Sequence, residues 1–332
     1  MMTVSRTPLR VSFFGGGTDY PEYFAERRGA VLGMAINQYV YVAALRLTNM
    51  LDYRYRVSYS RMEQVATLDA IEHPVVREAI RHYGYDQPLD ISIMADLPAR
   101  SGLGSSSSFT VGFVNLLFEL MGRPATKMDL AREAVHVERG LLGENVGVQD
   151  QHHAAFGGLN RFDFRGGRTR ISPIQMTGPC QAALTSSLFL VYTGLTRFAS
   201  ATLDEQMAKT KSGAADADLS HLLSLVDQSQ DVLESEDPPA MLADFGAMLH
   251  EGWETKKKLS SKVSNPQIDG LYDACRAAGA LGGKLCGAGA GGFLLMLVPP
   301  ERQAGFRAAM QRQGQALIPI GLDTLGATVL RG

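Results

Sequence analysis

Apolar positions in the first half of the chain predict strands joined by short polar turns, with a few helices between them. Runs rich in β-branched and aromatic residues are expected to be strands at 9–14, 30–47, 52–59 and 89–95. We expect a short helix over 74–83, and a buried helix over 109–121, where the sequence is apolar nearly all round. Apolar residues recur at helical spacing over 126–142. Residues 143–158 are expected to form a loop, and 160–171 a hairpin.

The second half has longer helical stretches and fewer strands. The pattern predicts strands at 188–192 and 293–298, helices at 201–211, 219–233, 240–262, 265–278 and 300–313, and two short closing strands. This order is typical of an α+β layer, in which helices cover one face of a sheet.

A glycine-serine stretch links the strand at 89–95 to the buried helix. Gly102 and Gly104 leave the backbone free to bend and to present bare amides, and four serines follow at 105–108. The N-terminus of a buried helix behind such a loop is a ready phosphate site. The same residues also fit a serine-capped core helix with a flexible entry loop, and this stretch alone leaves both interpretations open.

Two carboxylates stand out by their positions. Asp19 follows the tight turn Gly15-Gly16-Gly17-Thr18, where it could face a ligand or simply form an Asx-type turn. Glu138 falls on the apolar stripe of the helix expected over 126–142, so it needs a cation or several hydrogen-bond donors. An arginine from elsewhere would satisfy it; a metal ion is the more specific hypothesis.

Composition excludes several classes of protein. The formal net charge of the 332 residues is −2, which favours neither nucleic acid nor an anionic membrane as a partner. The three cysteines lack metal-ligand or CxxC spacing and indicate a reducing compartment. The start of the chain does not resemble a signal peptide, and no apolar run is long enough to span a membrane, so we expect a cytoplasmic protein.

The sequence does not satisfy either of the two familiar nucleotide-binding motifs. Gly287, Gly289 and Gly292 match G-x-G-x-x-G, but a predicted strand follows them, whereas the dinucleotide motif opens a helix. A Walker loop is absent from the sequence. If phosphates bind to this chain, neither of the two familiar phosphate loops holds them.

Three motifs together resemble the GHMP kinases, a family that includes galactokinases, homoserine kinases and mevalonate kinases. They are Arg10 with GGGTDY at 15–20, P-x-x-x-G-L-G-S-S-x at 98–107, and the glycine-rich run at 287–292. The resemblance covers nearly the whole chain. It implies an N-terminal domain like ribosomal protein S5 over 1–183 and a C-terminal ferredoxin-like domain over 184–332, with the site between them.

The resemblance also implies roles for individual residues. Asp150 matches the catalytic aspartate, acting as base or as aligner of the hydroxyl, and Arg10 its basic partner. Ser106 and Glu138 match the ligands of Mg²⁺. The ATP-binding positions are Pro98, Gly102, Leu103, Gly104, Ser105, Ser106 and Ser107, and those expected to bind substrate are Gly16, Gly17, Asp19, Gly289 and Gly291.

Within the family, four stretches look most like the members that phosphorylate the anomeric hydroxyl of D-glycero-D-manno-heptose 7-phosphate. These are TPLRVSFFGGGTDY, LPARSGLGSSSS, GENVGVQDQ and HEGWETKKKLSSK. Galactokinases carry Glu-His where Gly16-Gly17 stand here, which argues against galactose. A fucose- or galactose-type kinase, a decarboxylase of the same fold and a non-catalytic sugar sensor are the alternatives.

The implied partners are ATP and a sugar phosphate, and a homodimer stays open. A phosphorylated substrate needs cationic donors on the side of the cleft away from ATP. The candidates in this sequence are Arg197, Lys256, Lys257, Lys258 and Lys262, although a solvated basic face is the favoured explanation for them.

Overall fold

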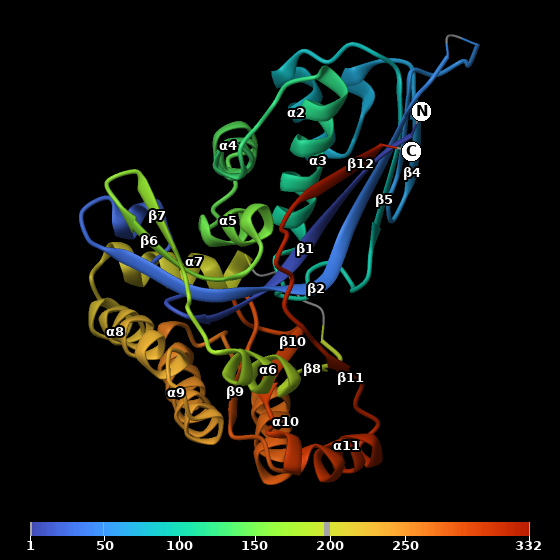
Figure 1. Cartoon of the computed structure of the whole chain (residues 1–332). Helices are drawn as coiled ribbons and strands as arrows, with labels where there is room; N and C mark the ends of the chain where they lie inside the picture. The colour runs from blue at the N-terminus through green and yellow to red at the C-terminus, as the bar shows by residue number, and fades with distance from the viewer. Residues whose placement is uncertain (1, 49, 196–199, 332) are drawn as a thin grey trace.

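The structure is a computed structural model that describes residues 2–48, 50–195 and 200–331, and it contains two sheets with helices packed on them (Figure 1). The larger sheet has the strand order β12-β1-β2-β5-β3-β4, and β6 pairs with both β2 and β7. Its strands are β1 (Met2–Phe14), β2 (Gly29–Arg46), β3 (Tyr55–Ser58), β4 (Met62–Val65), β5 (Leu89–Ala95), β6 (Leu159–Arg165), β7 (Arg168–Pro173) and β12 (Thr328–Arg331).

The buried helix of the first half packs on this sheet. The Ser108 hydroxyl donates to the carbonyl of Pro8 at 2.8 Å, and Gly112 leaves no room for a side chain, since a Cβ there would lie 2.5 Å from Thr7 Oγ1. The helices of this half are α1 (Pro21–Phe24), α2 (Pro74–Tyr83), α3 (Ser105–Met121), α4 (Lys127–Val135) and α5 (Gln149–Phe156).

The smaller sheet is antiparallel, with the order β11-β8-β10-β9. Its strands are β8 (Leu188–Tyr192), β9 (Gly282–Leu285), β10 (Phe293–Leu297) and β11 (Leu317–Pro319). The helices of the second half are α6 (Gly178–Ser186), α7 (Ser200–Lys211), α8 (Asp216–Leu233), α9 (Pro238–Leu259), α10 (Pro266–Ala277) and α11 (Gln303–Arg312). Numbered within this sheet, the order is 4-1-3-2, the ferredoxin-like arrangement. The predicted α+β class is therefore confirmed.

Several local predictions were wrong. The loop expected over 143–158 contains α5, whose N-terminus is held by a backbone hydrogen bond from Val148 N to Asp19 O at 3.0 Å. This helix lacks an apolar stripe because its buried face includes His152 and His153, which a pattern search counts as polar. The helix expected over 126–142 instead changes to a π-helical turn at His136–Leu141, and α6 was not predicted.

The chain ends in the sheet where it began. β12 pairs with β1, so the last residues of the second half return to the first (Figure 1). The boundary expected after residue 183 stays a prediction. No helix in the described part of the chain is long and apolar enough to cross a membrane.

Candidate active site

A cavity of about 290 Å³ lies where the two sheets meet. The glycine-serine loop, the loop after β1 and the start of α5 form one wall, and α9, β9 and the residues after β9 form the other. The lining residues include Arg10, Ser12, Gly16, Gly17, Asp19, Gly102, Gly104, Ser105, Ser106, Ser107, Gln149, Asp150, Lys256, Lys284 and Gly287.

The glycine-serine loop delivers an uncapped helix N-terminus to this cavity. Gly102 and Gly104 have φ of 80° and 75°, a conformation that glycine adopts without strain. Gly104 is the N-cap of α3 and supplies no side-chain hydrogen bond to it. The first-turn amides, from Ser105 onward, are therefore available, and together with the helix dipole they favour an anion.

The third glycine motif supports the loop from behind. A Cβ on Gly102 would collide with the carbonyl oxygen of Cys286, and one on Gly287 would lie 2.6 Å from the Cα of Gly102. Gly289 and Gly291, which we expected to contact the substrate, lie next to other parts of the chain. Their Cα atoms pack against Val263 and Leu195, and neither residue lines the cavity. Their role at the substrate stays a prediction, and Gly287 is the glycine of this motif that contacts the glycine-serine loop.

Two of the predicted ATP-binding residues, Pro98 and Leu103, are not among the residues that line the cavity. Leu103 is fully buried, and its carbonyl accepts a hydrogen bond from Arg10 N at 3.0 Å. Pro98 is exposed and lies outside the cavity lining. Their contact with ATP stays a prediction.

Arg10 and Asp150 form a bidentate pair at the centre of the cavity. Arg10 Nε lies 2.7 Å from one carboxylate oxygen of Asp150, and Nη2 lies 2.6 Å from the other. Arg10 Nη1 also donates to Gly102 O at 2.7 Å. Burial alone would lower the pKa of Arg10, but the Asp150 carboxylate outweighs it and the pKa is raised. The predicted pair, 140 residues apart in the chain, is thus brought together and tied to the phosphate loop.

Asp19 is almost fully buried beside this pair. One carboxylate oxygen accepts from Gly17 N at 3.0 Å, and the other accepts from Gln149 N at 3.3 Å. Burial, together with the nearby charge of Asp150, raises the pKa of Asp19. Gly147 must be glycine, because a Cβ there would overlap the Asp19 carboxylate. The first-motif prediction of a carboxylate facing the cavity is supported by this geometry.

Glu138 is buried with hydrogen-bond donors but without an ion-pair partner among the described residues. Ser107 Oγ and Thr110 Oγ1 donate to it at 3.0 and 2.9 Å, and the Gln151 amide donates to the same carboxylate. Burial raises its pKa to about 7, although these three hydrogen bonds oppose the rise. A carboxylate surrounded by hydroxyls is an oxygen set that suits Mg²⁺.

Ser106, the serine expected to share a metal with Glu138, does not itself bond to Glu138, and its role as a ligand stays a prediction. Ser106 is exposed at the cavity wall, whereas Ser107 is buried and bonds directly to Glu138. On a helix, successive side chains point in different directions, and the sequence alone does not fix which serine faces inward.

Sequence reasoning missed one lysine of the cavity and misjudged another. Lys284 in β9 is buried and donates to Phe13 O at 2.7 Å; Lys256 in α9 donates to Leu285 O at 3.0 Å and to Gly287 O. Burial lowers the pKa of Lys284 to about 8 and that of Lys256 to about 7. Neither lysine has a carboxylate partner in the described part of the chain, so this wall presents uncompensated positive charge to the cavity.

The residue pattern contained a signal for these lysines. Lys256 is four residues after Gly252 and three before Leu259, both on the buried face of α9, and Lys284 interrupts a buried strand. The other candidates do not line the cavity: Lys258 and Lys262 are exposed, and Lys257 pairs with Glu254. Arg197 lies outside the described residues.

Comparisons with known proteins give the family. Residues 69–158 match the family model described as the GHMP kinases N terminal domain, and residues 239–316 match the one described as GHMP kinases C terminal. The D-glycero-alpha-D-manno-heptose 7-phosphate kinase of Campylobacter jejuni is 29% identical over 327 residues, which is 93% of each chain. The bifunctional fucokinase/GDP-fucose pyrophosphorylase of Arabidopsis thaliana is 25% identical over 90% of this chain and 30% of its own length.

Solved structures agree with these matches. The structure of a D-glycero-D-manno-heptose 1-phosphate kinase from Bacteroides thetaiotaomicron has a TM-score of 0.80 at 25% identity and covers 99% of both chains. Lactococcus lactis galactokinase, solved with galactose, shares the fold with a TM-score of 0.73 at 17% identity, covering 98% of this chain and 95% of its own. The two family models together span about half of the chain, and the expected family, fold and enzyme class are confirmed. The chain belongs to the GHMP kinase family and is an ATP-dependent phosphotransferase of the sugar kinase type.

Proposed function

We propose that the chain transfers the γ-phosphoryl group of ATP to the anomeric hydroxyl of D-glycero-D-manno-heptose 7-phosphate, giving the 1,7-bisphosphate. The observation that carries the proposal is the charge distribution of the cavity. An uncapped helix N-terminus and an Arg10–Asp150 pair lie on one side, and two lysines without carboxylate partners lie on the other. That arrangement suits two phosphorylated ligands rather than one. A relative named for heptose 7-phosphate supports the same substrate.

The chemical step needs positioning and charge neutralisation more than covalent catalysis. ATP phosphates would bind the first-turn amides of α3, between Ser105 and Ser107. Asp150 would orient the sugar hydroxyl or accept its proton as the phosphoryl group leaves ATP. Arg10 fixes the orientation of that carboxylate through two hydrogen bonds, so the hydroxyl is held in line without rearrangement of the protein.

The residues around Glu138 fit a magnesium ion. Glu138 would be its charged ligand, and the hydroxyl of Ser107 or Ser106 a neutral one. Magnesium, when bound, supplies charge neutralisation for the phosphoryl oxygens. The chain's own contribution is a carboxylate kept in place by Ser107, Thr110 and Gln151.

Lys256 and Lys284 would bind the phosphate that the substrate already carries. Both lysines line the cavity wall formed by the second half of the chain, and among the described residues both donate to carbonyl oxygens only. A substrate phosphate offers them charged acceptors, which form stronger hydrogen bonds than neutral ones. Because burial lowers the pKa of Lys256 to about 7, the lysine would take up a proton when the phosphate binds.

The test is steady-state kinetics with heptose and heptose 7-phosphate, measured as ADP release. Lys256→Gln should raise KM for the phosphorylated sugar at least 10-fold and leave KM for the free sugar nearly unchanged. Lys258→Gln, which removes an exposed charge from the same helix, is the matched control. Equal effects of Lys256→Gln on both sugars would contradict the assignment. Turnover of fucose or galactose, with none of any heptose, would favour the alternative substrates.

A further inference from the structure

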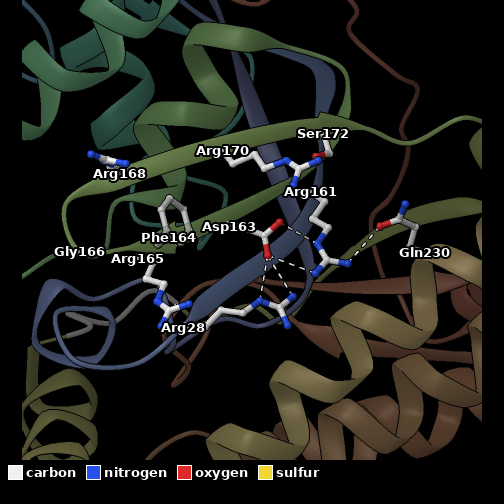
Figure 2. A pocket seen from close by; sticks show the side chains of 10 residues that line it. All are labelled: Arg28, Arg161, Asp163, Phe164, Arg165, Gly166, Arg168, Arg170, Ser172 and Gln230. Carbon is white, nitrogen blue, oxygen red and sulfur yellow. Dashed lines mark hydrogen bonds and ion pairs between the residues drawn. The ribbon is translucent and has the colours of Figure 1, made fainter.

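A second cavity of about 840 Å³ lies beside the β6–β7 hairpin and shares no described residue with the active-site cavity. The hairpin, Arg28 just before β2, and Gln230 in α8 surround it (Figure 2). Its lining includes five arginines, which are Arg28, Arg161, Arg165, Arg168 and Arg170. The proposed kinase reaction uses none of these residues.

The arginines lie together because successive side chains of a β-strand point to opposite faces of the sheet. Phe162 and Phe164 are buried in a core cluster, and the residues that alternate with them along β6, Arg161, Asp163 and Arg165, line the cavity, which Phe164 also borders. Gly166 and Gly167, with φ of 53° and 75°, form a tight turn that sets Arg165 directly opposite Arg168 in the strand register. Like charges at directly opposite positions destabilise a sheet unless something neutralises them.

The nearby carboxylates are already engaged. Arg28 Nη2 lies 3.0 Å from Asp163 and 2.7 Å from Asp227, and Arg161 Nη2 lies 2.6 Å from the same Asp227 oxygen. Figure 2 shows Arg28 and Arg161 converging on Asp163. Two carboxylates therefore balance two arginines, and the sheet face retains the charges of the other three.

Arg165, Arg168 and Arg170 are exposed, and no residue in the described ranges forms a hydrogen bond or ion pair with them. Three guanidinium groups on two adjacent strands thus border a cavity whose lining carboxylate, Asp163, is already paired with Arg28 and Arg161. Arginine is the side chain best suited to bind phosphate through paired N–H donors. The cavity volume is also within the range of small-molecule sites.

We propose that this cavity binds a small molecule that carries two or more phosphate groups. One phosphate would lie between Arg165 and Arg168 at the tip of the hairpin, and another near Arg170. A competing explanation is that β7, which pairs only with β6, carries charges simply to prevent edge-to-edge association. That explanation needs charge on the strand but predicts no ligand.

The first experiment uses isothermal titration of the full chain with inorganic tripolyphosphate, without magnesium. Wild type should show two sites, one in the active-site cavity and one here. Arg165→Gln/Arg168→Gln should retain the first and weaken the second at least 10-fold. Arg302→Gln/Arg312→Gln, which removes two exposed charges at the ends of α11, should bind like wild type. A titration curve of the hairpin variant identical to that of wild type would overturn the proposal.

A second experiment needs no variant. Phenylglyoxal modification of the unaltered chain, mapped by mass spectrometry, should be blocked by tripolyphosphate at Arg165, Arg168 and Arg170 and remain unaffected at Arg302 and Arg312. Absence of protection would contradict the proposal. Protection by a short single-stranded oligonucleotide but not by tripolyphosphate would assign the arginines to a nucleic acid and also overturn it. Self-association of the hairpin variant with unchanged tripolyphosphate binding would establish the edge-protection explanation instead.

Discussion

Replacement of Glu138 by glutamine should raise the free energy of unfolding of the metal-free protein, and the size of this increase should depend on pH. The Glu138 carboxyl is 1% exposed and has no cationic partner in the described part of the chain, so burial raises its pKa from 4.5 to about 7. Between these two values the folded protein binds more protons than the unfolded chain does. The free energy of unfolding contributed by this group therefore falls as the pH rises through that window.

The shift converts to an energy because the side chain is fully buried. One pKa unit corresponds to about 1.4 kcal/mol, so ionised Glu138 costs the folded protein about 3 kcal/mol above pH 7. A glutamine of the same shape removes that cost, and the hydroxyls of Ser107 and Thr110 can rotate to bond to it. Glu138→Gln should gain up to about 3 kcal/mol at pH 8 and almost nothing at pH 4.5.

Urea unfolding of both proteins at pH 4.5 and pH 8, with EDTA present, measures this difference. Glu301→Gln is the control, because Glu301 is exposed and should show no dependence of this kind. ATP with magnesium should reverse the order, since the wild-type carboxylate then gains a cation that glutamine cannot hold as tightly. A stability difference that is the same at both pH values would refute the assignment of Glu138 as a buried, unpaired carboxylate.

Three further predictions follow from the cavity. Asp150→Asn should lower kcat by about 10²–10⁴ with nearly unchanged ATP affinity by titration, and near-normal kcat would exclude a catalytic role. Gly102→Ala should destabilise the protein by roughly 1–3 kcal/mol and weaken ATP binding, because its Cβ would meet a backbone carbonyl. Gly84→Ala is the control, since Gly84 has a similar φ of 67° but open space around it; it should lower the stability measured by thermal unfolding less and leave ATP affinity unchanged. KM for the sugar phosphate should rise as the pH increases through about 7 to 8, where Lys256 loses its proton, and a flat profile would argue against a role for that ammonium group.

The structure brings together residues that the sequence motifs singled out. Arg10, Asp19, Gly102 and Asp150 all line one cavity, although they are far apart in the chain. Asp19 and Gly102 belong to glycine turns that the sequence marks, whereas Arg10 in β1 and Asp150 in α5 were located through the family motifs. Residues of this kind can be located before a structure is known.

Direction of side chains was less predictable. Whether Ser106 or Ser107 faces Glu138 depends on the rotation of α3 about its axis, which is set by packing on β1 and β2. Lys256 looked like part of an exposed run of lysines, yet the buried residues before and after it turn it toward the cavity. The glycine motif at 287–292 left the roles of Gly289 and Gly291 open, because such a motif can serve loop packing as well as ligand approach.

The most direct test of the account is the ratio of kcat/KM for heptose 7-phosphate to that for the unphosphorylated heptose, with the product identified by ³¹P NMR. Binding energy from the remote phosphate lowers the barrier at the reacting hydroxyl, so the ratio should exceed about 100. The product should carry a second phosphate on the anomeric carbon. Equal kcat/KM values, or phosphorylation at a different hydroxyl, would contradict the proposed substrate and the role assigned to the two lysines.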